Sequence, residues 1–288
     1  MLAVFKREFK SYMTTMLGPV FIGVMIAFVG IFFYLLNLVA GYPYFSMCLI
    51  SSFIILIVTV PLLTMRSFAE DRKSKADQIL FTSPLKLTDI VFGKFLAILA
   101  VFMIPVAVFC ICPLIIKFYG ETYLLLDYCT IFCYVMIGVL FITIGMYISS
   151  LTESVILAGV LSIGVLLVLY LLHNLVGYLP TGATATMAIL AIAAVVLGAV
   201  VYLIMRNIYV AAGVAAVGIF ADLMVFMINK RALEGLLPTV FRNFSVVDLL
   251  YNFFYYYMFD IVGIIKLILF SGLFLLFTVQ SLEKRRWS

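Results

Sequence analysis

The sequence predicts an all-α polytopic membrane protein in which about eight helices cross the bilayer. Of its 288 residues, 67% are hydrophobic and only 11% are charged, and the mean hydropathy is +1.30. Soluble domains carry about a quarter of charged residues, so these proportions exclude a water-soluble fold. A helix needs about 20 apolar residues to cross the hydrocarbon core. Residues 1–288 are therefore treated as a single transmembrane domain with almost no extramembrane mass.

Residues 1–16 precede the first long apolar run and carry an amphipathic pattern. Leu2, Phe5, Phe9 and Met13 recur at spacings of three and four, and basic residues lie between them. Such a pattern is typical of a helix in the plane of the membrane interface, and a frayed basic tail is the alternative. The apolar run that follows is too long for a cleaved signal peptide.

Apolar runs separated by polar or Gly- and Pro-containing turns define the predicted spans. In chain order they cover about 17–39, 45–65, 90–116, 128–150, 155–176, 186–205, 208–228 and 261–282. Pro61 is expected to bend the second span, and Pro105 and Pro113 the third. Gly138 and Gly145 share one face of the fourth, where they permit close packing either within one subunit or across a dimer interface.

The runs at 186–228 are rich in Ala and Gly where the others are rich in Phe, and they form an extra helix pair. Residues 229–260 are polar-rich and end in an aromatic stretch. Its helix is predicted to begin at Ser245 and Asp248, which have the spacing of a capping box. Because aromatic side chains favour the lipid–water boundary, 229–260 is predicted to be an outer segment with an aromatic helix before the last span.

Residues 66–89 interrupt the apolar sequence with a dense group of charges. The stretch 68–81 contains no Pro or Gly, and Asp71 precedes Lys75 by four residues, an order that stabilises helices. Ile79 and Leu80 belong to an apolar edge. A water-exposed helix is therefore predicted over this stretch, and a loop held by lipid headgroups is the alternative.

The distribution of basic residues predicts the orientation, because cytoplasmic segments carry the excess of Lys and Arg. With a cytoplasmic N-terminus, thirteen of the 18 bases lie inside: Lys6, Arg7, Lys10, Arg66, Arg72, Lys73, Lys75, Lys86, Lys94, Arg206, Lys284, Arg285 and Arg286. Lys117, Lys230, Arg231 and Arg242 lie outside. Eight spans then place both termini and residues 66–89 in the cytoplasm. Since these bases sit beside spans, they do not indicate nucleic-acid binding.

No catalytic, cofactor or metal site is evident in the sequence. Gly93-Lys94 lacks the other residues of a phosphate-binding loop. His173 is the one histidine, and the five cysteines lie in apolar runs without the spacing of a metal site. Asp222 and Lys266 lie inside predicted spans at similar depth, so an intramembrane ion pair is predicted; separate solvation, with Lys266 extended to the interface, is the alternative.

Three stretches resemble the ABC-2 (type 2) permeases of ABC transporters, in the order of that family. Ala69-Glu70-Asp71-Arg72-Lys73, continuing to Ile79-Leu80-Phe81-Thr82-Ser83-Pro84 and Gly93-Lys94-Phe95, resembles the cytoplasmic loop of the family. Ser149-Ser150-Leu151-Thr152-Glu153 resembles its next cytoplasmic turn, and FLLFTVQSLEKRRW, from Phe274 to Trp287, resembles the C-terminus of its gliding-motility-type branch. The chain departs from the family at Lys75, Ala76 and Gln78, where Gly-Thr and Glu are frequent, and in its extra helix pair, since six spans are usual.

The resemblance implies a non-catalytic permease subunit of an ATP-driven exporter in the plasma (inner) membrane of a prokaryote. Its implied partners are two copies of a separate ATP-binding subunit, which holds ATP and Mg, a second permease copy or a homologous permease, and membrane lipid. No cofactor is expected in this chain. The implied contacts with the ATPase subunit are Glu70, Asp71, Arg72, Lys73, Lys75, Ile79, Leu80 and Glu153.

Two other classes of function were weighed against this one. A self-sufficient secondary transporter is expected to show an internal repeat and several ionisable residues in mid-span, and we find no repeat. A membrane-embedded lipid-modifying enzyme would need His, Asp or Glu clustered at one interface, which the sequence does not suggest.

Overall fold

A computed structural model describes residues 1–75, 86–120, 122–205, 208–228, 230–245 and 260–287, and every regular element in these ranges is a helix. Contacts divide the chain into two compact units. Unit 1 comprises Met1–Val168 and Val247–Ser288, and unit 2 comprises Leu169–Val246. The predicted all-α fold is confirmed.

Unit 1 begins with the predicted interfacial helix, α1 (Leu2–Thr14), which packs against α7 (Leu87–Phe109). The two backbones approach closely at Gly93, where an added Cβ would lie 3.0 Å from Cβ of Val4. The first span follows as α2 (Leu17–Phe32), continued without interruption by a π-helical segment, η1 (Phe33–Val39). Its combined limits are those that the sequence predicted.

The second predicted span is broken, but not where Pro61 led us to expect. It consists of α3 (Phe45–Ser51) and α4 (Ile54–Thr64), bent by 63° at the intervening residues, whereas Pro61 lies inside α4. The hydroxyls of Ser51 and Ser52 bond back to carbonyls of α3, at 2.8 and 3.2 Å. Such side-chain bonds compete with the backbone ladder and bend helices. A bend at Pro61 itself stays a prediction.

The third and fourth spans are α7 with the short α8 (Cys112–Tyr119), and α9 (Leu124–Leu151). Pro105 lies within α7, while Pro113 stands in the first turn of α8, where its missing N–H is tolerated. The fifth span, α10 (Val155–Val176), matches the predicted run, and the last, α16 (Ile261–Trp287), begins where predicted and continues five residues further. α10 crosses the boundary between the two units.

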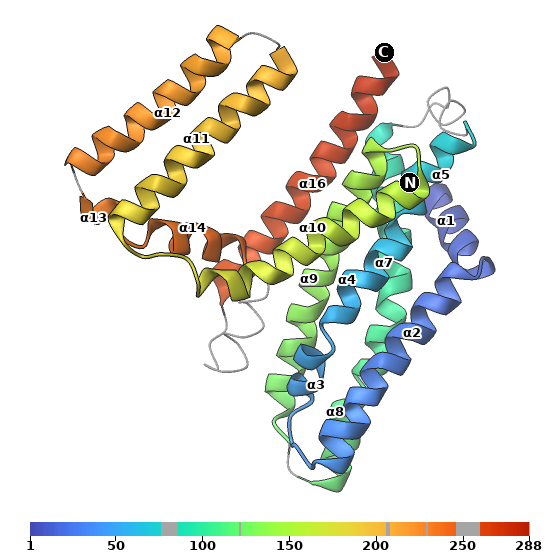
Figure 1. Ribbon diagram of the computed structural model, residues 1–288. Helices are drawn as coiled ribbons and strands as arrows, with labels where there is room; N and C mark the ends of the chain where they lie inside the picture. Colours follow the sequence, from blue (N-terminus) through green and yellow to red (C-terminus); the bar gives the residue numbers. More distant parts are fainter. Residues whose placement is uncertain (76–85, 121, 206–207, 229, 246–259, 288) are drawn as a thin grey trace. The chain divides into compact units, whose positions relative to one another are not determined.

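The core of unit 1 is built around α9, which packs against α3, α4, α5, α7 and α16 (Figure 1). Its Tyr134 is fully buried and faces Phe53, Phe102 and Phe109 at ring-centroid distances of 6.3–6.5 Å. An added Cβ on Gly138 or Gly145 would collide with Phe102 or Thr64 of the same chain. The two glycines therefore serve packing within the subunit.

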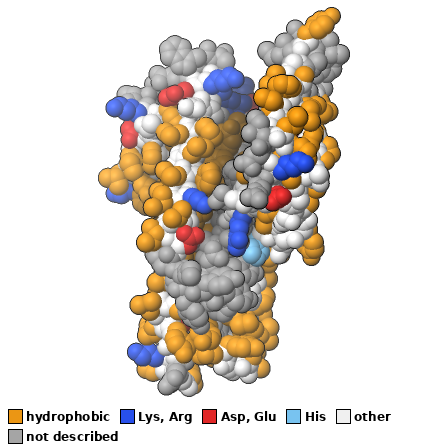
Figure 2. Space-filling view, turned by 90° about the vertical axis from the view of Figure 1, so that its left-hand side faces the viewer, with side chains coloured by type: hydrophobic (Ala, Val, Ile, Leu, Met, Phe, Trp, Pro, Cys, Tyr) orange, Lys and Arg blue, Asp and Glu red, His pale blue; other side chains and the backbone are white. Residues whose placement is uncertain are grey.

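The outer surface is that of a membrane protein. Figure 2 shows hydrophobic side chains over most of the described surface in view, with few charged ones among them. Five helices among the described residues are long and apolar enough to span a bilayer, or six if the bent α3–α4 pair counts as one span. The chain is thus a multi-pass membrane protein. The total of eight spans stays a prediction.

Unit 2 contains the extra helix pair as a hairpin of α11 (Ala183–Met205) and α12 (Ile208–Ile228), which pack along each other. Two short helices follow, α13 (Lys230–Leu233) and α14 (Leu236–Phe244). Gly235 has φ of +71° and starts α14, a conformation that glycine adopts without strain. The predicted aromatic helix after Ser245 falls outside the described residues.

Candidate functional site: a buried lysine where three helices meet

The charged segment begins as a continuation of α4. Helix α5 (Arg66–Lys73) follows α4 after Met65, where the regular hydrogen-bond ladder is interrupted. Ser149 of α9 fills the interruption: its Oγ accepts from N of Phe68 and N of Ala69, at 3.2 and 3.1 Å, and donates to O of Met65 at 3.0 Å. One hydroxyl thus satisfies three backbone groups and fixes α5 on α9.

Helix α5 ends earlier than the sequence predicted. The prediction extended a helix to residue 81, but α5 stops at Lys73, and Lys75 has φ of +57°, outside the helical region. The Ser74 hydroxyl donates to O of Glu70 at 2.9 Å and caps the end. A serine hydroxyl competes with backbone N–H groups for the carbonyls of a helix and so favours its end. The sequence prediction considered only the charged residues nearby, which favour a helix.

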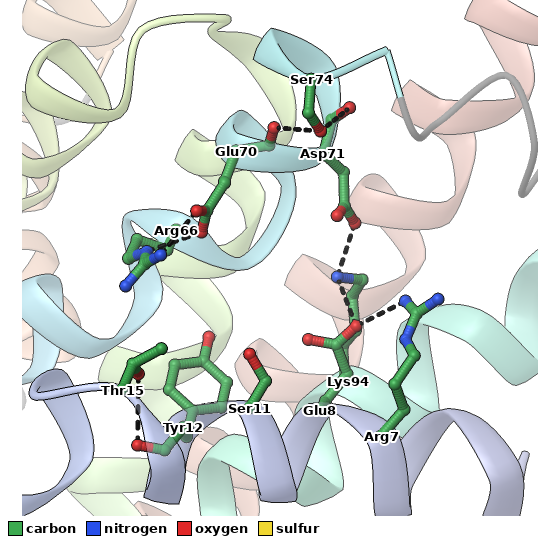
Figure 3. A pocket seen from close by; sticks show the side chains of 10 residues that line it. All are labelled: Arg7, Glu8, Ser11, Tyr12, Thr15, Arg66, Glu70, Asp71, Ser74 and Lys94. Atoms are coloured by element: carbon green, nitrogen blue, oxygen red, sulfur yellow. Dashed lines mark hydrogen bonds and ion pairs between the residues drawn. The ribbon is translucent and has the colours of Figure 1, made fainter.

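A polar cluster joins α5 to α1 and α7, with Lys94 of α7 at its centre (Figure 3). Only 3% of the Lys94 side chain is exposed. Its Nζ lies 2.7 Å from Oδ2 of Asp71 and 3.2 Å from Oε1 of Glu8, and it donates to O of Ser67 at 2.6 Å. Glu8 also accepts from Arg7 at 2.7 Å. We call Arg7, Glu8, Asp71 and Lys94 the Lys94 cluster.

The charges of the Lys94 cluster compensate one another. Burial acts to raise the pKa of Glu8, but the charge of Lys94 and hydrogen bonds from Arg7 and Lys94 outweigh it, so this pKa lies below its usual 4.5. Two cations then face two carboxylates. A buried lysine is stable only with such partners, so the cluster acts as an internal clamp between the three helices.

The Lys94 cluster borders a pocket of about 350 Å³ between α1 and α5, in which Figure 3 shows the hydroxyls of Ser11 and Tyr12 on the α1 side. Arg66 and Glu70 pair across one turn of α5, with Nε to Oε2 at 2.6 Å. Tyr12 donates to O of Leu63 at 3.2 Å, and burial raises the pKa of its hydroxyl, which stays a neutral donor. These groups suit hydrogen bonding and ion pairing. Among the described residues, no three His, Cys, Asp or Glu side chains are grouped to bind a metal ion.

The predicted coupling residues divide into two sets. Glu70, Lys73 and Lys75 project from the protein, with Glu70 paired to Arg66. Arg72, expected as a surface contact, is only 7% exposed and donates to O of Thr152 at 3.3 Å. The turn after α9 thus accepts a hydrogen bond from the guanidinium, and the contact of Arg72 with an ATPase subunit stays a prediction.

Other predicted residues lie apart from this surface. Asp71 belongs to the Lys94 cluster, and Glu153 forms an exposed pair with Arg285 of α16 at 3.2 Å. Ile79 and Leu80 fall outside the described residues. Asp222 belongs to unit 2 and Lys266 to unit 1, so their ion pair stays a prediction.

Sequence reasoning missed the structural roles of Glu8, Lys94 and Ser149. Lys94 was counted as a cytoplasmic base and as part of a Gly-Lys pair, but no partner was predicted for it, although it directly precedes a long apolar run. Glu8 is the only acid among residues 1–16, which was a usable signal. Nothing in the sequence distinguishes Ser149 from Ser150, since only the packing of α5 on α9 selects between them.

Comparison with known protein families gives one result. A family model described as "ABC-2 family transporter protein" matches residues 2–212. This range contains α1, α5, the Lys94 cluster and the turn after α9. No curated protein and no solved structure matched the chain.

Proposed function

The chain belongs to the ABC-2 family of transporter proteins, and we propose from this premise that it is the permease subunit of an ATP-driven transporter. In this proposal a separate subunit binds and hydrolyses ATP with Mg, in two copies, and a second permease copy or a homologous permease completes the complex. Transport is outward, across the plasma membrane of a prokaryote, with both termini in the cytoplasm. The resemblance to the gliding-motility-type branch belongs to the same proposal.

The observation that carries this function is the form of α5. Its exposed side carries Glu70 and Lys73, and Lys75 follows it, while its other side is held by Ser149, Arg72 and the Lys94 cluster. A docking element needs an exposed side, which the partner contacts, and a side attached to the protein, through which its movement is transmitted to the spans. The N- and C-terminal ends of unit 1 lie at the same end as α5 (Figure 1), which supports placing all three in the cytoplasm.

The Lys94 cluster connects the docking element to the spans in this proposal. A force applied to α5 by the ATPase subunit passes through Asp71 and Lys94 to α7, and through Glu8 to α1. It passes through Ser149 and Thr152 to α9, around which unit 1 is built. We propose that ATP hydrolysis moves these spans together with α5.

The test is purification of the tagged full chain from its own host, followed by identification of co-purifying proteins and measurement of Mg-dependent ATPase activity. We expect an ATP-binding subunit with the wild type, and its loss in the Lys73→Glu/Lys75→Glu variant, whose changed side chains are exposed. Lys117→Glu, an exposed change on α8, is the matched control and should retain the subunit.

Two outcomes would contradict the proposal. Absence of any ATP-binding subunit from the wild-type complex would refute the permease function. Retention of the subunit, with full ATPase activity, by the double variant would refute the docking role of α5. Arg72 is not a suitable position for this test, because its burial would confound docking with folding.

A further inference from the structure

A second pocket lies on the other side of α1 and is entirely apolar. Met1, Leu2 and Phe5 of the N-terminal segment line it together with Leu96, Leu99, Ala100 and Met103 of α7. Its volume is about 370 Å³, and we call it the α1–α7 groove. All seven residues belong to unit 1, and Leu2 and Met103 are 73% and 42% exposed.

The groove has the position and length of the part of a lipid acyl chain that lies next to the headgroup. α1 is an amphipathic helix of the interfacial kind, whose apolar side enters the headgroup and acyl boundary. From there the groove follows α7 from Leu96 to Met103, a rise of about 10 Å at 1.5 Å per residue, toward the middle of the span. A chain that enters beside α1 would therefore lie along α7 within the hydrocarbon core.

The headgroup end of the groove is positively charged. Lys6 and Lys10 follow Leu2 at successive intervals of four residues, so they form one row along α1. Both are exposed, and neither takes part in the ion pairs found among the described residues. Arg7, by contrast, is engaged by Glu8. Lysines at this level attract anionic headgroups.

We propose that the α1–α7 groove, Lys6 and Lys10 form a binding site for an anionic phospholipid of the leaflet in which α1 lies. One acyl chain occupies the groove, and the lysines hold the phosphate of the headgroup. Because α1 is joined to α5 and α7 by the Lys94 cluster, the bound lipid would steady the helix to which α5 is clamped. The proposal goes beyond the transport function and does not depend on an ATPase partner.

The test uses tryptophan quenching by lipids with brominated acyl chains. The single native tryptophan is replaced by Trp287→Phe, and Met103→Trp places a fluorophore at the deep end of the groove. The protein is reconstituted into phosphatidylcholine vesicles that contain increasing amounts of brominated phosphatidylglycerol or brominated phosphatidylcholine. We expect brominated phosphatidylglycerol to give the same quenching at a mole fraction at least about fivefold lower than brominated phosphatidylcholine. Each base near the headgroup contributes about that factor to the binding of an anionic lipid.

Two controls make the result specific. Lys6→Gln/Lys10→Gln changes exposed residues only and should abolish the preference while leaving quenching by phosphatidylcholine. Leu269→Trp, on the exposed side of α16, should be quenched equally by both lipids. Equal quenching of the Met103→Trp protein by both lipids would overturn the proposal, as would a preference that survives loss of both lysines. No quenching by either lipid would mean that protein covers the groove, which also overturns it.

Discussion

Replacing Lys94 by methionine tests whether the Lys94 cluster clamps α1, α5 and α7. Methionine keeps most of the length and volume of the lysine stem, so the change removes the ammonium group without opening a large cavity. The variant loses the contacts of Nζ with Asp71, Glu8 and the Ser67 carbonyl at 2.7, 3.2 and 2.6 Å. What remains is a pair of carboxylates without their shared cation.

The cost follows from the burial of these groups. Breaking a buried ion pair typically costs 3–5 kcal/mol, because the remaining charge stays unpaired. Here Glu8 keeps Arg7, and the side chains of Glu8 and Asp71 are 14% and 22% exposed, so water partly compensates. We therefore expect a loss of about 2–3 kcal/mol in the free energy of unfolding. For a chain of this size, that lowers Tm by roughly 4–12 °C.

Thermal unfolding of the purified protein in lipid nanodiscs measures this shift. Lys86→Met, an exposed change just before α7, is the matched control and should leave Tm unchanged. Asp71→Asn in the Lys94→Met background should recover part of the loss, because it removes one unpaired charge. An unchanged Tm in Lys94→Met, or strictly additive losses in the double variant, would refute the clamp.

Two further predictions concern the same region. Because the pKa of Glu8 is lowered in the folded protein, its ionised form stabilises the fold above the ordinary value of 4.5, and this contribution is lost as pH falls through the lower folded value. The Tm difference between wild type and Glu8→Gln should thus be constant above about pH 5 and shrink below pH 4.5; a difference independent of pH would contradict it. Ser149→Ala should lower stability by about 1–3 kcal/mol, since two amides of α5 lose their acceptor. Ser150→Ala, which removes only a bond to a carbonyl of its own helix at 2.7 Å, should cost less in the same unfolding assay, and an equal cost would argue against the role of Ser149.

Long apolar runs were predicted well because a helix in the bilayer must satisfy its backbone hydrogen bonds internally and consists almost entirely of apolar residues. The limits of the first span, 17–39, and of the fifth, 155–176, agree with the structure to the residue. Short-range interruptions were predicted poorly. Pro61 is a strong local signal, yet the 63° bend lies at Ser52 and Phe53, next to hydroxyls that bond back to carbonyls of α3.

The sequence predicted which segment contains the candidate site but not which of its residues contact one another. The charges at 66–89 indicated a polar segment at a membrane surface, and local helix propensity predicted one helix from Phe68 to residue 81. The structure ends that helix at Lys73 and covers Arg72 with the turn at Thr152. Exposure of one charged residue depends on a segment about 80 positions away, which no local pattern contains.

By itself, the sequence determined the class of protein, the limits of the first and fifth spans and the location of the charged segment, because hydropathy and charge are read within a single helix. Only the tertiary structure decided which charges meet. Glu8, Asp71 and Lys94 come from three helices, and their pairing at 2.7 and 3.2 Å depends on Gly93 admitting α1 close to α7 and on Ser149 holding α5. A buried charge is tolerated only beside its partner, and that partner is chosen by packing rather than by sequence distance.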